Sequence, residues 1–494
     1  MEPLLKGLAF VLQPTTLLWI VAGDIVGIFV GALPGLTATM ALALFLPLTI
    51  HLDSLTGIAL MLGLYFGAVT GASIPAILFG IPGNPNAIAT VLDGLPMARK
   101  GQAGVALGGA VIASLIGGLV STAALLAASP ALARFSLLFG PAEYFALAVA
   151  SLTIIASVSG RSLLKGVVMG ALGVLLSTVG IDTVTGIQRF TFGNPFLATG
   201  IGLVPVLIGM FGITQALEDA GRPGGAVQVV TRHLGRLFPR LGQLRRMWRI
   251  LLESSWIGTL VGILPGAGAS VAVMLAYERA KQLSERPDEF GTGRLEGVMA
   301  PEVANNACIG GGLIPTLTLA LPGESAAVPI LAALVLHGIT PGPLLFSFQP
   351  HFIYAVVFAM IVANLTTCLF QLVGIRLFVK ALSIPPPLLT PLIIVLSIVG
   401  AYALNGYLFD AAVAVVAGLS GFVLRRAGYP LIPLILGLVL GGMLESEFRR
   451  AMIITGGDPS VFITRPLSAL LLAAGVMFLA RQLMHARRAK GEMA

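Results

Sequence analysis

Long apolar stretches without ionisable residues recur along the chain. Three of them, residues 101–133, 254–277 and 325–375, contain no Lys, Arg, Asp or Glu. A helix that crosses a bilayer needs roughly 20 apolar residues, so each stretch can hold at least one such helix. The pattern predicts an all-α polytopic membrane protein with about 12–14 membrane segments. The clearest expected spans are residues 105–128, 142–158, 163–179, 198–216, 352–375, 388–404, 411–424 and 467–479.

Glycine and proline interrupt many of these stretches. The chain has 61 Gly and 31 Pro. Backbone that leaves helical geometry inside a membrane must be buried in protein or line a water-filled cavity, and small residues let helices approach closely. We therefore expect broken or re-entrant helices around an internal site.

The chain contains two copies of one unit. Residues 26–44 and 257–275 agree at 9 of 19 positions without a gap, and residues 71–89 and 311–329 agree at 6 of 19. Pro75 and Pro82 match Pro315 and Pro322. We therefore expect a first transmembrane repeat at residues 1–221, a basic cytoplasmic linker at 222–249, and a second repeat at 250–494 with an extra C-terminal helix.

Basic residues indicate how the two repeats are oriented. Segments rich in Lys and Arg face the cytoplasm under the positive-inside rule, and here they include residues 99–100, 222–249, 279–294 and 481–490. The loop at 337–343 has no formal charge, whereas its counterpart at 93–102 is basic. Equivalent loops would then face opposite sides, which predicts two inverted repeats with a site near the bilayer midplane. A parallel duplication is the alternative.

Composition excludes several classes of protein. Charged residues make up only 10% of the chain, whereas a soluble fold carries about 25%. The net charge of +8 arises in short basic segments between apolar runs, so it does not indicate nucleic-acid binding. Cys308 and Cys368 lie far apart, and the five His show no metal-ligand spacing. Acid, His and Cys groups do not cluster as an enzyme requires. We expect no enzyme activity, no cofactor and a retained amino terminus.

A Leu-Pro-Gly sequence ends one apolar segment in each copy, and small or hydroxylated residues follow it. At such a broken helix, free N–H groups and the positive dipole end of the second half can hold a carboxylate, while freed carbonyls can bind a sodium ion. A proline kink that serves only packing is the alternative. The substrate-binding candidates here are Pro34, Gly35, Thr37, Thr39, Pro265, Gly266, Gly268 and Ser270.

A Pro-Gly turn interrupts the next apolar run in each copy. A turn at the tip of a re-entrant segment places backbone and amide groups at membrane depth, where they can bind a substrate. The alternative is a short loop exposed to water, whose polar residues need no ligand to explain them. The substrate-binding candidates here are Pro82, Gly83, Asn84, Asn86, Pro322, Gly323 and Ser325.

Several acidic and amide side chains lie in or beside apolar stretches. An ionisable group inside a membrane needs an internal partner or water and is a candidate for an ion pathway. As alternatives, Glu302 could cap a first helical turn, and Asp24 could be an acid at the membrane boundary. A carboxylate beside Glu324 would be repelled unless that acid were protonated or paired with a cation. The ion-coupling candidates are Asp24, Glu302, Asn305, Asn306 and Glu324, and Na+ could bind near the Pro-Gly breaks.

Several segments together resemble the large membrane subunit of the tripartite tricarboxylate transporters, the TctA family. They are residues 80–83, 90–94, 97–101, 261–266 and 337–343, and further on residues 189–193 and 436–445. The resemblance covers almost the whole chain. It implies a secondary transporter of the bacterial inner membrane that works with a small membrane subunit and a periplasmic solute-binding protein. Residues 84–86 and 324–325 depart from the pattern of citrate-type members, so the resemblance does not identify the transported solute.

The expected function is import of a citrate-like di- or tricarboxylate, driven by symport of Na+ or H+ with alternating access. A self-sufficient organic-anion permease or channel is the alternative. The lipid bilayer is expected to surround the chain. The sequence does not decide whether the chain forms a homo-oligomer.

Overall fold

The computed structural model describes residues 2–33, 35–158, 162–182, 185–221, 235–265, 268–381 and 386–491. Regular structure in these ranges is helical except for one antiparallel pair of two-residue strands. Seven described helices are long and apolar enough to cross a membrane, and six shorter apolar helices accompany them. The predicted all-α polytopic membrane fold is confirmed.

Two compact units divide the chain, and each takes segments from both predicted repeats. Unit 1 comprises Met1–Ala133 and Gln215–Leu396, and unit 2 comprises Arg134–Thr214 and Ser397–Ala494. Both copies of the Leu-Pro-Gly and Pro-Gly segments therefore belong to unit 1. The start of the expected linker, residues 222–234, lies outside the described residues, and the orientation of the repeats in the membrane stays a prediction.

Unit 1 holds most of the helices. The chain passes into unit 2 within α7, returns to unit 1 after Thr214 at the start of α12, and enters unit 2 again within α20. Its elements are α1 (Glu2–Val11), α2 (Pro14–Ala32), α3 (Ala38–Thr49), α4 (Ser54–Gly71), α5 (Ser73–Phe79), η1 (Pro85–Ala87), α6 (Ile88–Arg99), α7 (Ala103–Ser136), α12 (Thr214–Ala220), α13 (Leu241–Arg246), α14 (Trp248–Ile263), α15 (Gly268–Leu283), η3 (Pro287–Glu289), α16 (Leu295–Leu319), α17 (Ala327–Leu336), α18 (Pro343–Phe348), α19 (Pro350–Ala381) and the start of α20 (Pro386–Asn405).

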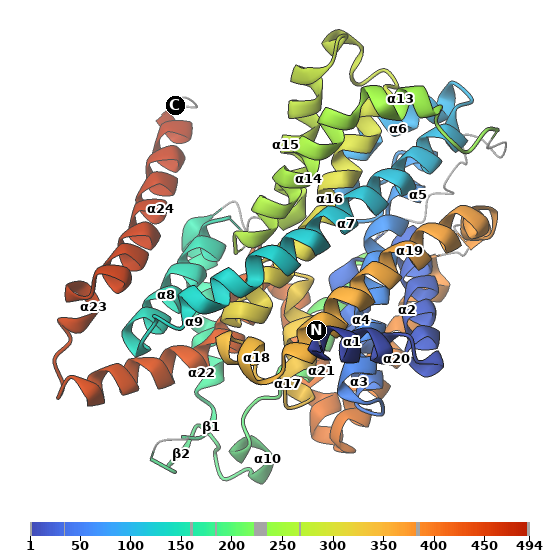
Figure 1. Ribbon diagram of the computed structural model, residues 1–494. Helices are drawn as coiled ribbons and strands as arrows, with labels where there is room; N and C mark the ends of the chain where they lie inside the picture. Colours follow the sequence, from blue (N-terminus) through green and yellow to red (C-terminus); the bar gives the residue numbers. More distant parts are fainter. Residues whose placement is uncertain are drawn as a thin grey trace. The chain divides into compact units, whose positions relative to one another are not determined.

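Glycines let α2 and α4 pack backbone against backbone, and Figure 1 shows the two helices side by side. A Cβ atom on Gly27 would lie 2.5 Å from the carbonyl oxygen of Leu64 and 2.9 Å from the nitrogen of Ala68. Small residues four apart are typical of tightly packed membrane helices. The glycines of this contact are Gly23, Gly27 and Gly31 on α2 and Gly63, Gly67 and Gly71 on α4.

The second copy repeats this packing between α14 and α16. A Cβ atom on Gly262 would lie 2.8 Å from the carbonyl oxygen of Cys308 and 3.0 Å from the nitrogen of Gly312. Gly258 meets the backbone of Ala304 in the same way. Because Gly258 and Gly262 match Gly27 and Gly31 in the sequence repeat, the two copies share local structure as well as sequence.

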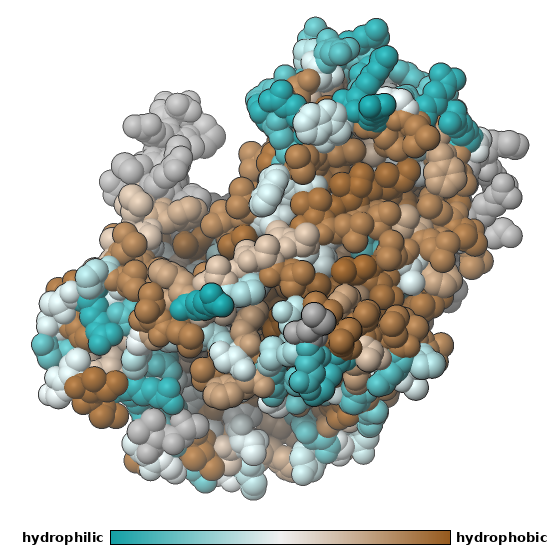
Figure 2. Space-filling view, in the orientation of Figure 1, coloured by the Kyte–Doolittle hydropathy of each residue, from teal (hydrophilic) through white to brown (hydrophobic). Residues whose placement is uncertain are grey.

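The surface of unit 1 fits a helical bundle in a membrane. In Figure 2, hydrophobic residues cover the face formed by α7 and α19, and hydrophilic residues gather at the end that carries α13 and the loop after α15. That end includes the basic segment at residues 279–294, which we expect to be cytoplasmic.

Asp93 on α6 holds the loop that leads into α16. Its buried carboxylate accepts hydrogen bonds from the Tyr277 hydroxyl at 2.9 Å and from the backbone N–H groups of Gly293 and Arg294 at 2.7 Å each. It also lies near the first turn of α16, where a negative charge is favourable. This acid therefore joins the first copy to the second.

We expect Asp93→Asn to destabilise the protein by about 2–3 kcal/mol, because an NH2 group would then face N–H donors. Tyr277→Phe removes one of these hydrogen bonds and should cost about 1.5 kcal/mol, the lower end of the range for a hydrogen bond to a charged group. Thermal unfolding in detergent compares the two variants, and equal unfolding temperatures would contradict this assignment.

Unit 2 has its own small framework. An ion-pair network joins the strand pair to α22: Arg189 lies 2.6 Å from Glu445, and Arg449 lies 2.8 Å from Asp182 and 2.7 Å from Glu445. Two of these residues, Arg189 and Glu445, come from the distant segments 189–193 and 436–445 that carry the family resemblance. The elements of unit 2 are α8 (Pro141–Val158), α9 (Leu163–Ser177), β1 (Gly180–Ile181), β2 (Gln188–Arg189), α10 (Pro195–Ala198), α11 (Leu203–Leu207), the π-helix η2 (Ile208–Ile213), the rest of α20, α21 (Leu408–Arg426), α22 (Leu431–Ile454), α23 (Val461–Thr464) and α24 (Pro466–Gly491).

Candidate functional site

Both predicted helix breaks are present. Helix α2 ends at Ala32 with Leu33 in an extended conformation, and α14 ends at Ile263 with Leu264 extended in the same way. Gly35 has a φ of +93°, which suits glycine because it lacks a Cβ atom. The expected broken helices are thus confirmed in both copies. Of the break candidates, Pro34 and Gly266 lie outside the described residues.

The helix after the first break begins with a hydroxyl cap. Thr37 accepts a hydrogen bond from the backbone N–H of Met40 at 3.2 Å, as N-cap residues commonly do. In the second copy α15 begins at Gly268, whose φ is +70°, and Ser270 is partly buried. Each break is therefore followed directly by the amino end of a helix, which presents N–H groups suited to an anion.

The two Pro-Gly turns follow helices that end alike. Helix α5 ends at Phe79, before Gly80 with a φ of +68°, and α16 ends at Leu319, before Ala320 with a φ of +55°. Pro82 is partly buried and Pro322 is buried. Because Gly80 and Ala320 both have a left-handed conformation, the backbone leaves the helix in the same way in the two copies.

Each Pro-Gly turn packs on the helix that precedes the break of its own copy. A Cβ atom on Gly83 would lie 2.6 Å from the carbonyl oxygen of Gly31. Gly323 approaches the carbonyl of Gly262 at the matching place, and its N–H donates to the carbonyl of Gly312 at 3.4 Å. Break and turn, which are 48 or more residues apart in the sequence, thus form one structural element in each copy.

A side-chain contact joins the two copies. The Thr39 hydroxyl, just after the first break, donates to the Ser325 hydroxyl in the second Pro-Gly turn at 3.3 Å. Thr39 is buried and Ser325 is partly buried. The structure therefore brings a break candidate from one repeat against a turn candidate from the other within unit 1.

The two turns differ in charge at one matching position. Asn84 Oδ1 accepts hydrogen bonds from the N–H groups of Asn86 and Ala87 at 3.0 and 3.1 Å, so it caps the turn. Asn86 is partly buried. Glu324 occupies the corresponding place in the second copy with an exposed fraction of 6%, and its carboxylate has no hydrogen-bond or ion-pair partner among the described residues. One turn is neutral and the other carries an acid.

Glu302 lies deep in α16, so the expectation that it could cap a first helical turn is wrong. The helix already begins at Leu295, and Glu302 is completely buried. Its Oε1 accepts a hydrogen bond from the Thr90 hydroxyl at 2.5 Å, whereas Oε2 has no partner in the described part of the chain.

The two asparagines after Glu302 differ in their surroundings. Asn306 Oδ1 accepts a hydrogen bond from the Thr70 hydroxyl at 3.0 Å, and its Nδ2 donates to the carbonyl of Glu302 at 3.3 Å. Asn305 is also buried, but neither its oxygen nor its nitrogen has a hydrogen-bond partner among the described residues. The ion-coupling candidates on α16 thus include both paired and unpaired polar groups.

Asp24 lies in the middle of α2 and not at its end. It is completely buried, and its carboxylate accepts hydrogen bonds from the hydroxyls of Thr366 and Thr367 on α19, the latter at 2.7 Å. Asp24 precedes Leu33 by more than two helical turns. The structure therefore does not place this acid at the break, where the other candidates gather.

Sequence reasoning missed several polar groups around these elements. Tyr65 and Thr70 on α4 and Thr90 on α6 are uncharged polar residues with apolar or small neighbours, and nothing in the sequence pattern distinguishes them. Asp219 on α12 is another: a Cβ atom on Gly35 would lie 2.8 Å from its Oδ2. Its position in a mixed segment after an apolar span gave no indication that it meets the first break.

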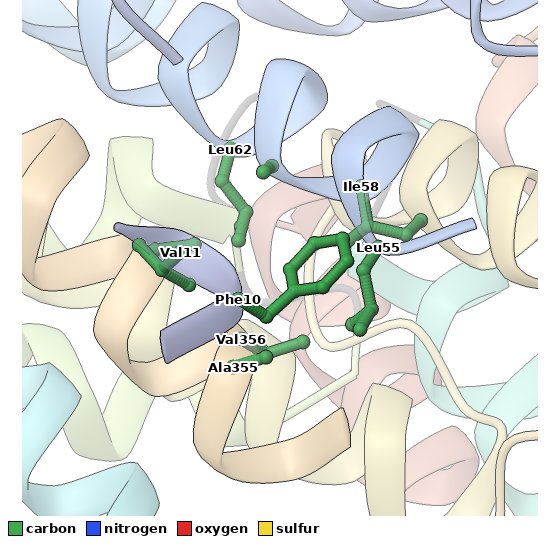
Figure 3. A pocket seen from close by; sticks show the side chains of 9 residues that line it. Phe10, Val11, Leu55, Ile58, Leu62, Ala355 and Val356 are labelled. Atoms are coloured by element: carbon green, nitrogen blue, oxygen red, sulfur yellow. The ribbon is translucent and has the colours of Figure 1, made fainter. Parts of the chain in front are cut away.

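A small pocket of unit 1 does not contribute to this site. It lies between α1, α4 and α19, and Figure 3 shows apolar side chains around it, including Phe10, Leu62 and Val356. The gap has no room for a water molecule, and none of the candidate residues lines it. It is a packing gap.

Comparison with known proteins agrees with the motifs. A family model described as the tripartite tricarboxylate transporter TctA family matches residues 17–436. An uncharacterized 52.8 kDa protein in the TAR-I ttuC' 3'region of Agrobacterium vitis is 39% identical over 488 residues, which are 98% of this chain and 96% of that protein. An uncharacterized protein in the TAR-II ttuC' 3'region of the same organism is 42% identical over 233 residues, 47% of this chain and 96% of that protein. No solved structure matches. The chain is a multi-pass membrane protein, and it belongs to the tripartite tricarboxylate transporter TctA family.

Proposed function

We propose that this chain is the large permease subunit of a tripartite, binding-protein-dependent secondary transporter that imports di- or tricarboxylates by cation symport. Family membership supports the transport class. The observation that carries the proposal is the contact between Thr39 and Ser325, which joins the break of one repeat to the turn of the other. Paired broken elements that meet inside one unit are the arrangement in which many secondary transporters bind their substrate.

The breaks supply groups that suit an anion. Helices α3 and α15 each begin directly after a break, and their first N–H groups and positive dipole ends attract a carboxylate. The hydroxyls of Thr39 and Ser325 add neutral hydrogen-bonding groups beside them. A substrate with two or three carboxylates could engage both copies at once.

Glu324 explains why a cation would accompany the substrate. Two negative charges about 4 Å apart repel each other by about 4 kcal/mol at an effective dielectric constant of 20. That repulsion alone would lower substrate affinity about a thousandfold. A proton on Glu324, or a sodium ion beside it, removes the repulsion, so anion binding and cation binding would favour each other. The buried acids Glu302 and Asp24 are further candidates for cation coupling.

The remaining features of the proposal follow from the family and the repeats. The partners would be a small membrane subunit and a periplasmic solute-binding protein, and the membrane would be the bacterial inner membrane. Transport would proceed by alternating access, in which one part of the protein moves relative to another and exposes the site to each side in turn.

Uptake of labelled citrate into vesicles tests this function. The vesicles hold the chain with its small subunit and binding protein, and sodium and proton gradients are imposed separately. We expect uptake that requires the binding protein and responds to one of the two gradients. Uptake that is undiminished without the binding protein would contradict the tripartite assignment, and flux independent of any gradient would indicate a channel.

A further inference from the structure

Several buried polar atoms in the long helices of unit 1 lack hydrogen-bond partners among the described residues. Among them are the hydroxyl of Tyr65 on α4 and both amide atoms of Asn305 on α16. Their exposed fractions are 0% and 1%. Buried polar groups in folded proteins nearly always form hydrogen bonds with protein, water or a ligand. Each of these side chains therefore has hydrogen-bonding groups available for water or a bound ligand.

Tyr65 and Asn305 occupy the same position in the two copies. Tyr65 precedes Pro75 by 10 residues and Gly83 by 18, and Asn305 precedes Pro315 and Gly323 by the same intervals. This correspondence links a tyrosine with an asparagine, so it is invisible as sequence identity. It is found only when the two copies are aligned at their Pro-Gly turns and the residue intervals are compared.

The local packing confirms that the positions match. The residue before Tyr65 is Leu64, whose backbone meets Gly27 of α2, and the residue before Asn305 is Ala304, whose backbone meets Gly258 of α14. Successive residues differ by about 100° around a helix. Both unpaired groups therefore leave their helix on the same side, about 100° around the helix from the residue at the glycine contact.

Both helices pack against elements that follow the breaks and turns. Helix α4 contacts α3, which follows the first break, and α17, which follows the second turn. Helix α16 contacts α15, which follows the second break, and η1 and α6, which follow the first turn. Each unpaired group thus lies on a helix that contacts the element after the break of its own copy and the element after the turn of the other copy.

We propose that Tyr65 and Asn305 are a matched pair of substrate-binding residues, one from each copy, that donate hydrogen bonds to carboxylate oxygens of the transported anion. This inference rests on the proposed function and adds two residues to it. A phenol hydroxyl and a carboxamide NH2 are both neutral donors. They stabilise a carboxylate without adding a charge to a site that already contains Glu324.

The test measures citrate binding by Tyr65→Phe and Asn305→Leu, which remove the donors and keep similar shapes. Citrate, malate and succinate are titrated into the purified protein, and ligand-dependent thermal unfolding reports the affinity. We expect each variant to bind citrate about tenfold or more weakly, because a hydrogen bond to a charged group is lost. The unfolding temperature without ligand should be unchanged or higher, because no protein partner is lost.

Tyr277→Phe is the matched control. It also removes one buried hydroxyl from unit 1, but that hydroxyl donates to Asp93. It should lower the unfolding temperature without ligand and leave the affinity for citrate unchanged.

Unchanged citrate affinity in both variants would overturn the inference and would mean that ordered water satisfies these groups. A lower unfolding temperature with unchanged affinity would overturn it as well, because both residues would then be structural. If the unaltered protein responded to none of the three carboxylates, the proposed function would fail first and this inference with it. The response of the unaltered protein therefore separates the two failures.

Discussion

Replacing Gly27 by Ala should destabilise the protein by about 3 kcal/mol, the upper end of the usual cost of overpacking. The new Cβ atom would lie 2.5 Å from the carbonyl oxygen of Leu64 and 2.9 Å from the nitrogen of Ala68. Both atoms belong to the backbone of α4, so no side chain can turn aside to make room. Thermal unfolding in detergent and the yield of folded protein measure the effect.

Gly442→Ala is the control for this prediction. Gly442 lies in α22, and among the described residues no atom outside the neighbouring backbone of that helix lies within 4 Å of the position its Cβ atom would take. Alanine is favoured over glycine in a helix by up to about 1 kcal/mol, so this variant should be as stable as the unaltered protein or more stable. If both alanine variants unfolded at the same temperature, close backbone packing of α2 on α4 would not be what holds the first copy together.

Replacing Glu324 by Gln should abolish cation-driven accumulation of substrate. A tenfold cation gradient stores about 1.4 kcal/mol per ion and supports about tenfold accumulation of a coupled solute. The glutamine keeps the size of the side chain but holds neither a transferable proton nor a charge for a sodium ion. We expect labelled citrate to equilibrate across the vesicle membrane and no longer to accumulate when a gradient is imposed.

Glu285→Gln serves as the matched control, because Glu285 is an exposed acid in the loop after α15. It should accumulate citrate like the unaltered protein. Full gradient-driven accumulation by Glu324→Gln would show that another acid, such as Glu302 or Asp24, couples the cation. The same comparison can then be made with Glu302→Gln.

The sequence predicted the helix breaks well because their cause is local. Proline lacks an N–H group and glycine adopts positive φ angles, so a Leu-Pro-Gly sequence in an apolar run cannot continue a helix unchanged. Repetition at Pro265 strengthened the prediction.

Helix α22 was absent from the clearest expected spans, because Glu445, Glu447 and the two arginines after them make its second half polar.

Other parts of the site depend on contacts between distant segments. The hydrogen bond of Thr39 with Ser325 joins residues that are 286 apart, and that of Thr90 with Glu302 joins residues that are 212 apart. No single-sequence pattern relates such hydroxyl groups to their partners. Asp93 illustrates the same point, since the loop that it holds belongs to the other copy.

The most direct test of the account asks whether substrate occupies the place where the two copies meet. Ser325→Cys is introduced after Cys308 and Cys368 have been replaced by serine, and the rate of its reaction with a maleimide is measured with and without citrate. Ser347→Cys, in an exposed part of α18, is the control. We predict that citrate slows the reaction at position 325 and leaves it unchanged at 347. Equal rates at position 325 under conditions where citrate is bound would contradict the assignment of the substrate site to the paired breaks and turns.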